Sequence, residues 1–80
     1  MTIAELIRAT REAKGWSQET LARTAGVSTS TVIRLETGRQ VPYAGTLYEL
    51  ADALELSLED LRAAVRDTDQ PGQRRLRAAT

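Results

Sequence analysis

One stretch of this 80-residue chain carries side chains suited to reading the edges of base pairs. Ser28, Thr29 and Ser30 are followed closely by Ile33 and Arg34, and no carboxylate interrupts them. Hydroxyls can bond to either strand of a duplex, a guanidinium can fork onto guanine, and an aliphatic chain can touch thymine methyl groups. The alternative interpretation is that the hydroxyls only cap and cover a short helix and that Arg34 is an ordinary solvated arginine.

Two short helices joined by a tight bend would present that stretch. The first is predicted to begin after Ser17 and to end at Gly26, where glycine can adopt a positive φ. The second is predicted to begin after Ser28 and to end at Gly38. A connection of about three residues sets two such helices at roughly 90–120°, the geometry of a helix-turn-helix. The apolar positions that would bury the inner faces are Leu21, Ala22, Ala25, Val27, Val32 and Leu35.

Helical periodicity continues on both sides of this pair, and no segment alternates like a strand. One more helix is predicted before Gly15, a fourth around residues 47–54 and a fifth after Ser57. We interpret Glu59 and Asp60 as charges that suit the positive first turn of the fifth helix, not as a metal site. The fold class is therefore predicted to be all-α with five helices. The positions at helical spacing in these three helices are Ile3, Leu6, Ile7 and Thr10 in the first, Leu47, Leu50, Ala51 and Leu54 in the fourth, and Leu58, Leu61 and Val65 in the fifth.

The composition excludes several kinds of function. The chain has no cysteine and no histidine, so we expect no disulfide, no metal, no cofactor and no enzymatic activity. Its 11 basic and 11 acidic residues balance, which argues against coating of nucleic acid by bulk charge but allows a small basic face. The longest apolar run, residues 63–65, is far too short to span a membrane. Charges interrupt the apolar stretch where a secretory signal would lie, so a cytoplasmic location without membrane association is expected. No small-molecule ligand is expected, because no second domain offers an effector pocket.

Residues 3–65 resemble the phage repressor/Cro-like (lambda-repressor-like) helix-turn-helix family. The positions that carry the resemblance are Arg11, Gln18, Leu21, Ala22, Gly26, Val27, Val32, Leu35, Glu36, Gly38, Pro42, Leu47, Ala51 and Leu54. The resemblance implies a five-helix domain, with the helix-turn-helix in helices 2 and 3, that binds double-stranded DNA as a dimer. It also implies a transcriptional regulator, typically a repressor, on a palindromic site whose half-sites lie about 34–36 Å apart or a multiple of that.

The resemblance also assigns roles to individual residues. Base-reading positions of the family correspond to Ser28, Thr29, Ser30 and Arg34, with Ile33 beside them. Positions that meet phosphate correspond to Gln18, Arg39 and Tyr43. Arg11 and Glu36 correspond to a pair that ties the first helix to the third and orients it. The alternatives are that Gln18 and Arg39 are plain surface residues, that Tyr43 covers the rim of the core, and that Trp16 is structural.

Some positions depart from the family pattern. Thr20 stands where the pattern favours Glu, so no reciprocal capping box with Ser17 is expected. Thr10 replaces a core residue and Leu6 stands where a charge is common, which predicts either a rotated buried stripe or an exposed Leu6. An exposed Leu6, together with two arginines against five carboxylates over 41–66, leaves a rival function open. That rival is a protein-interaction module on the same fold, such as an antitoxin or a regulator's partner.

The chain is predicted to divide into a helix-turn-helix domain over 1–66 and a flexible basic tail over 67–80. The tail contains three arginines and Leu76. It is either disordered, or runs along phosphates, or packs through Leu76 on a partner. A second copy of the domain is expected to bind through side chains of the fifth helix that the core only partly needs. These dimer candidates are Leu58, Leu61 and Val65.

Overall fold

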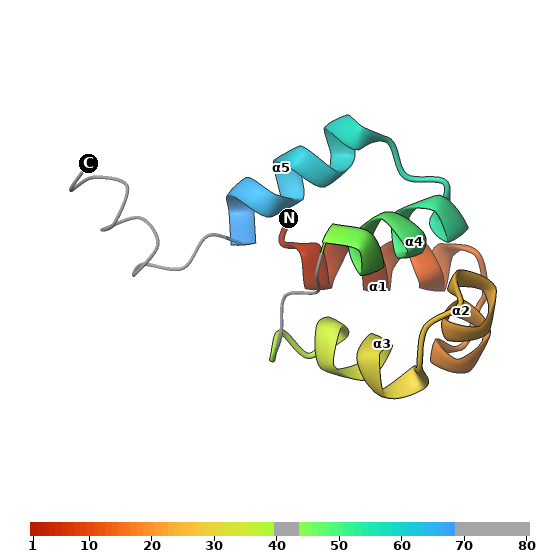
Figure 1. The fold of residues 1–80 in the computed structure, drawn as a ribbon. Helices are drawn as coiled ribbons and strands as arrows, with labels where there is room; N and C mark the ends of the chain where they lie inside the picture. The colour runs from red at the N-terminus through yellow and green to blue at the C-terminus, as the bar shows by residue number, and fades with distance from the viewer. Residues whose placement is uncertain (40–43, 69–80) are drawn as a thin grey trace.

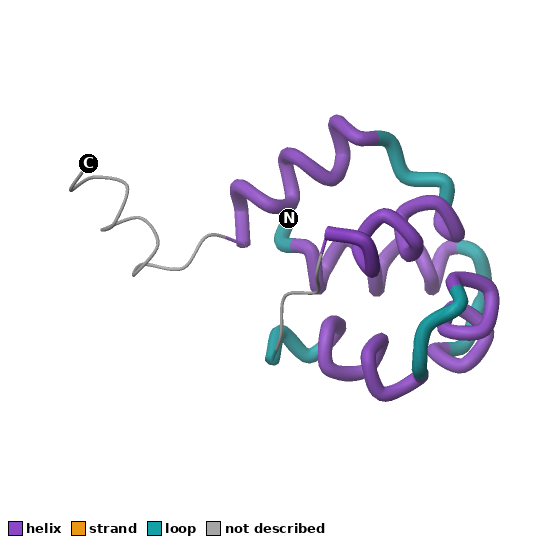
Figure 2. The backbone as a smooth tube through the Cα atoms, viewed as in Figure 1, coloured by secondary structure: helices purple, strands orange, loops and turns teal. Residues whose placement is uncertain are grey.

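The computed structural model describes residues 1–39 and 44–68, and over these ranges the chain forms five helices and no strand (Figures 1 and 2). The helices are α1 (Ile3–Ala13), α2 (Gln18–Ala25), α3 (Thr29–Glu36), α4 (Ala44–Leu54) and α5 (Leu58–Thr68). The predicted all-α class is confirmed. Helix α5 continues through Asp67 and Thr68, two residues past the predicted domain boundary at 66.

Helix α1 holds the fold together, because it packs against α3, α4 and α5, while α2 packs against α3 and α4. In Figure 1, α5 lies on one side of α1 and α4, and α3 lies on the other. The two ends of the helical region are also joined, since the backbone N–H of Ile3 donates to Thr68 Oγ1 at 2.8 Å. Thr68 therefore closes the domain instead of beginning a tail.

The core is aliphatic because the chain contains no phenylalanine. The predicted inward positions of α2, α3 and α4 are all buried, and Val27 packs partly buried against them. The fully buried large side chains are Ile3, Ile7, Leu21, Val32, Leu50 and Leu54. In α5 the buried residues are Leu61 and Ala64, so Leu58 and Val65 lie outside the core.

The departures from the family pattern in α1 are accommodated without exposing Leu6. Leu6 is half-buried and packs against the core, so the predicted exposure of this side chain is wrong. Thr10 fits beside it because its hydroxyl donates to the Leu6 carbonyl at 2.7 Å, which leaves no unsatisfied polar atom there. The support that an exposed Leu6 gave to a protein-interaction function is therefore lost.

The helix ends follow the predicted signals with two exceptions. Ser17 and Ser28 cap α2 and α3, and Gly15, Gly26 and Gly38 have φ values of +73°, +74° and +74°. The first exception is a capping box at the start of α1, formed by Thr2 and Glu5, which the sequence analysis did not predict. The second follows α4, where Glu55 adopts φ +60° without being glycine.

Candidate nucleic-acid interface

The bend between α2 and α3 is built by local hydrogen bonds. Gly26 takes the left-handed conformation at the end of α2, and the N–H of Val27 returns to the Ala22 carbonyl at 2.9 Å. Ser28 then starts α3 by accepting the N–H of Thr31 at 3.1 Å. Ala22 is 2% exposed and belongs to the core cluster. The bend fixes α3 relative to α2.

Burial of one side of α3 leaves the predicted reading side chains on the surface. Val32 and Leu35 are buried, whereas Ser30 and Arg34 are exposed and Thr29 is half-buried. Ile33 is 42% exposed, although it is a large apolar side chain. The structure thus brings these residues together on one outward face, which we call the α3 face: Ser28, Thr29, Ser30, Ile33 and Arg34.

Ser28 differs from the other members of the α3 face. Its hydroxyl oxygen accepts from the Thr31 backbone and lies 2.8 Å from Thr31 Oγ1. Because this oxygen already caps α3, the Ser28 hydroxyl has less hydrogen-bonding capacity left for a ligand. Ser30 is the exposed hydroxyl of the same turn without a capping role.

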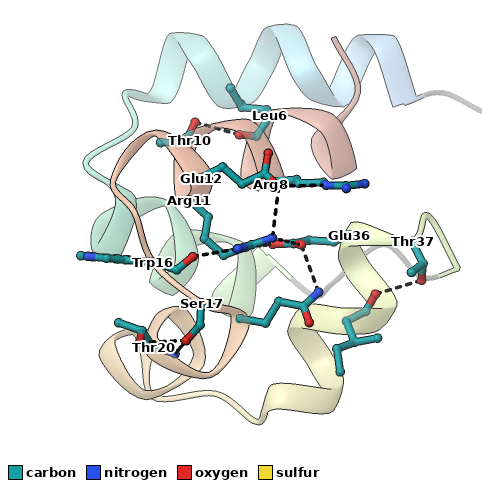
Figure 3. Close-up of polar contacts among 12 residues, drawn as sticks. Leu6, Arg8, Thr10, Arg11, Glu12, Trp16, Ser17, Thr20, Glu36 and Thr37 are labelled. Carbon is teal, nitrogen blue, oxygen red and sulfur yellow. Dashed lines mark hydrogen bonds and ion pairs between the residues drawn. The ribbon is translucent and has the colours of Figure 1, made fainter.

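A buried ion pair holds the inner side of α3. Glu36 accepts from Arg11 Nε at 2.7 Å and from Arg11 Nη2 at 2.9 Å, and the Glu36 and Arg11 side chains are 3% and 11% exposed. Arg11 Nη1 also donates to the Trp16 carbonyl at 2.7 Å (Figure 3). The bond to Glu36 raises the pKa of Arg11 above its usual value, against the effect of burial. The predicted partners are in contact, and the single carboxylate of α3 points inward.

Gln18 extends this pair to the start of α2. Its side-chain Nε2 donates to Glu36 Oε1 at 3.2 Å, so one carboxylate is shared by Arg11 and Gln18. The family resemblance predicted a phosphate contact for Gln18, and its bond to Glu36 was not predicted. The backbone N–H groups of a first helical turn point away from the helix and favour an anion. Gln18 is thus anchored where α2 presents its positive end.

The remaining predicted contacts are distributed as follows. Arg39 is exposed just after α3, where its N–H donates to the Arg34 carbonyl at 3.0 Å. Tyr43 lies outside the described residues. Among the dimer candidates, Leu58 and Val65 are 54% and 44% exposed, but Leu61 is 5% exposed and belongs to the core. Leu61 is therefore not available as a contact side chain.

One exposed aromatic residue was not singled out from the sequence. Tyr48 of α4 is 57% exposed and lines the same groove as Leu58 and Val65. Its position directly after the buried Leu47, outside the apolar stripe of α4, was the available signal. The three exposed side chains form a patch between α4 and α5, which we call the α4/α5 patch.

The described parts of the chain offer neither a metal site nor a membrane span. Residues 1–39 and 44–68 contain no cluster of three or more acidic, histidine or cysteine side chains able to hold a metal ion. No helix within these ranges has the length and apolar character needed to cross a membrane. The α3 face and the α4/α5 patch are the surfaces on which we base a function.

The geometry of α2 and α3 defines a helix-turn-helix protein, and comparison with known proteins agrees. A family model described as helix-turn-helix matches residues 7–61. The chain is 38% identical over 55 residues to the uncharacterized HTH-type transcriptional regulator YazB of Bacillus subtilis (strain 168). That alignment covers 69% of this chain and 80% of YazB. The protein belongs to the Cro/CI-like helix-turn-helix family, as the resemblance of residues 3–65 predicted.

Proposed function

We propose that this protein is a sequence-specific regulator of transcription that binds double-stranded DNA and acts as a repressor. The observation that carries the proposal is the α3 face, where hydroxyls, an aliphatic chain and a guanidinium lie outward while Glu36 is turned away. The exposed Ile33 has no role in the core, and contact with thymine methyl groups gives it one. Membership of the family and the regulator name of YazB support the same function.

In this proposal α3 enters the major groove and the ends of the neighbouring helices meet the backbone. Gln18 and the first turn of α2 bind one phosphate, and Arg39 binds another. Tyr43 remains a predicted phosphate contact from the family resemblance alone. A regulator that binds DNA in this way acts in the cytoplasm, on the chromosome or on another DNA duplex.

We further propose that the active form is a homodimer on a palindromic site. The α4/α5 patch supports this, because Tyr48, Leu58 and Val65 expose apolar surface that the monomer does not bury. A two-fold dimer reads two half-sites, which would lie about 34–36 Å apart or a multiple of that spacing. The predicted role of Leu61 is not carried into this proposal, since its side chain is in the core.

The experiment is selection of binding sites from random duplex DNA, followed by Arg34→Ala on the selected site. We expect a palindromic consensus and a loss of about 1–3 kcal/mol of binding free energy in the variant, with folding unchanged. Arg8→Ala is the matched control, since Arg8 is an exposed arginine on α1 whose carboxylate partner is Glu12. Equal affinities for Arg34→Ala and Arg8→Ala would show that Arg34 does not read a base.

The second candidate function is a protein-interaction module, for example an antitoxin or a regulator's partner. The α4/α5 patch is the observation that favours it, because exposed apolar surface also suits another protein. The same selection from random duplex DNA separates the two candidates. If it enriches no sequence, even at salt low enough to retain weak binding, the protein-interaction function is favoured over DNA binding.

A further inference from the structure

Tyr48 forms a ridge between two grooves of different character. On one side it lines a groove between α4 and α5, and on the other it lines a groove between α2 and α4. Tyr48 is 57% exposed, so its side chain separates the two grooves at the surface. The two grooves differ in the sign of the charged side chains that line them.

The groove between α4 and α5 is apolar with a basic edge. Its apolar lining includes the exposed Leu58 and Val65. Its charged lining residues are Arg62 and Arg66, with no carboxylate among them. Both arginines are exposed, and neither makes an ion pair within 4.0 Å in the described part of the chain. This side of the ridge therefore combines apolar surface with two exposed arginines.

The groove between α2 and α4 is acidic. Its charged lining residues are Glu49 and Asp52, again exposed and without an ion pair among residues 1–39 and 44–68. Glu49 Oε2 lies 3.6 Å from the place that a Cβ on Gly26 would occupy, so this carboxylate sits against the end of α2. The C-terminal end of a helix is itself partly negative. Glu49 and Asp52 therefore add to this negative end, and no basic side chain of residues 1–39 and 44–68 forms an ion pair with them.

We infer that a second copy of this chain binds across the Tyr48 ridge, with Arg62 and Arg66 of each copy facing Glu49 and Asp52 of the other. In a two-fold contact each surface meets the reverse arrangement of itself, so a basic groove and an acidic groove flanking one ridge are mutually complementary. Tyr48, Leu58 and Val65 supply the apolar area, and the four charges set the register of the two copies. This inference rests on the homodimer proposed above.

The test is a charge exchange measured by sedimentation equilibrium at low salt. One variant carries R62E and R66E, and the other carries E49R and D52R. Each variant alone places like charges across the contact, so we expect its dimer dissociation constant to rise at least tenfold. An equimolar mixture restores opposite charges at both contacts, and we expect dimers of wild-type affinity that contain one copy of each. Circular dichroism confirms that each variant is folded.

Neutral variants provide a second test that does not require the charge-reversed variants to fold. R62Q/R66Q and E49Q/D52N remove the attraction without adding repulsion. We expect dimerisation of the wild type to weaken as salt is raised, because salt screens exposed charges, and dimerisation of the neutral variants to change little. An equally steep salt dependence in both would overturn the inference.

The remaining outcomes separate this inference from the proposal beneath it. A wild type that stays monomeric at tens of micromolar, with and without its DNA site, would refute both the homodimer and this contact. A wild-type dimer that is indifferent to charge exchange, or reversed variants that do not recombine, would leave the homodimer standing and overturn the contact. Loss of dimerisation on deleting residues 69–80 would also overturn it, because the contact inferred here uses none of those residues.

Discussion

Replacement of Arg11 by methionine tests how strongly the buried ion pair holds the fold. Methionine keeps much of the volume of the arginine stem but leaves the Glu36 carboxylate, 3% exposed, without its cation. It also removes the donor to the Trp16 carbonyl. Loss of one partner of a buried pair costs about 3–5 kcal/mol. At about 0.05–0.15 kcal/mol per residue, an 80-residue chain has only about 4–12 kcal/mol of stability in total.

The assay is urea unfolding followed by circular dichroism, with thermal melting beside it. We expect Arg11→Met to lower the free energy of unfolding by about 3–5 kcal/mol. At about 4–8 °C per kcal/mol for a domain of this size, its Tm should fall by at least about 12 °C. The matched control is Arg8→Met, which breaks an exposed pair with Glu12 at 3.5 Å and should cost about 0.5 kcal/mol or less.

A double variant completes this test. Arg11→Met combined with Glu36→Met removes both charges, and burial of two apolar side chains in their place is often neutral or stabilising. We therefore expect the double variant to be more stable than Arg11→Met alone. Two results would refute this reasoning: a loss of less than about 1 kcal/mol in Arg11→Met, or additive effects of the two substitutions on the free energy of unfolding. Either would show that leaving one charge of the pair buried and unpaired is not strongly destabilising.

Four further outcomes follow from the described structure. Gly26→Ala should cost about 1–2 kcal/mol of stability in urea unfolding, because φ +74° is strained for alanine while the added Cβ meets no close contact. Glu55→Gly should melt about 4–8 °C above Glu55→Ala, because both lack the carboxylate and only glycine relieves φ +60°; equal Tm values would show that this residue is unstrained. A hydrogen bond from the Thr2 backbone lowers the pKa of Glu5, and one from Lys14 lowers the pKa of Glu55. The stability that these two ionised carboxylates contribute is therefore fully present at neutral pH and is lost as the pH falls below about 4. Urea midpoints measured from pH 7 to pH 3 should therefore decline, and less so in Glu5→Gln. Deletion of residues 69–80 should reduce the slope of log affinity against log salt by about two to three if its arginines bind phosphate, and leave it unchanged otherwise.

Sequence reasoning recovered the helices because spacing and glycine positions both carry strong local signals. Leu47, Leu50, Ala51 and Leu54 show one buried stripe, and the glycines after α1, α2 and α3 take positive φ as predicted. The end of α4 was less visible, since Glu55 fills a position where a glycine would have marked the turn. The last two residues of α5 were missed for a similar reason, because Thr68 is held by a bond to Ile3, 65 residues away, which no local pattern shows.

The candidate site was recovered unevenly for physical reasons. Outward residues of α3 followed directly from the buried positions of Val32 and Leu35. The second partner of Glu36 was not predicted, because a long Gln18 side chain can point to solvent or inward with the same sequence. Leu61 was assigned to a partner although the core uses it, since leucines at helical spacing do not reveal which of them lies deepest.

The shared carboxylate of Glu36 joins α1, the start of α2 and the end of α3. Because fully satisfied buried polar networks rigidify a fold, we expect these three helices to move as one unit. Such a unit has little freedom to adjust its shape when it meets a duplex. The adjustment then falls to the DNA, whose bending cost depends on its base steps. Selected sites should accordingly favour flexible pyrimidine–purine steps at positions that no side chain touches, and stiff tracts placed there should weaken binding even with every contacted base intact.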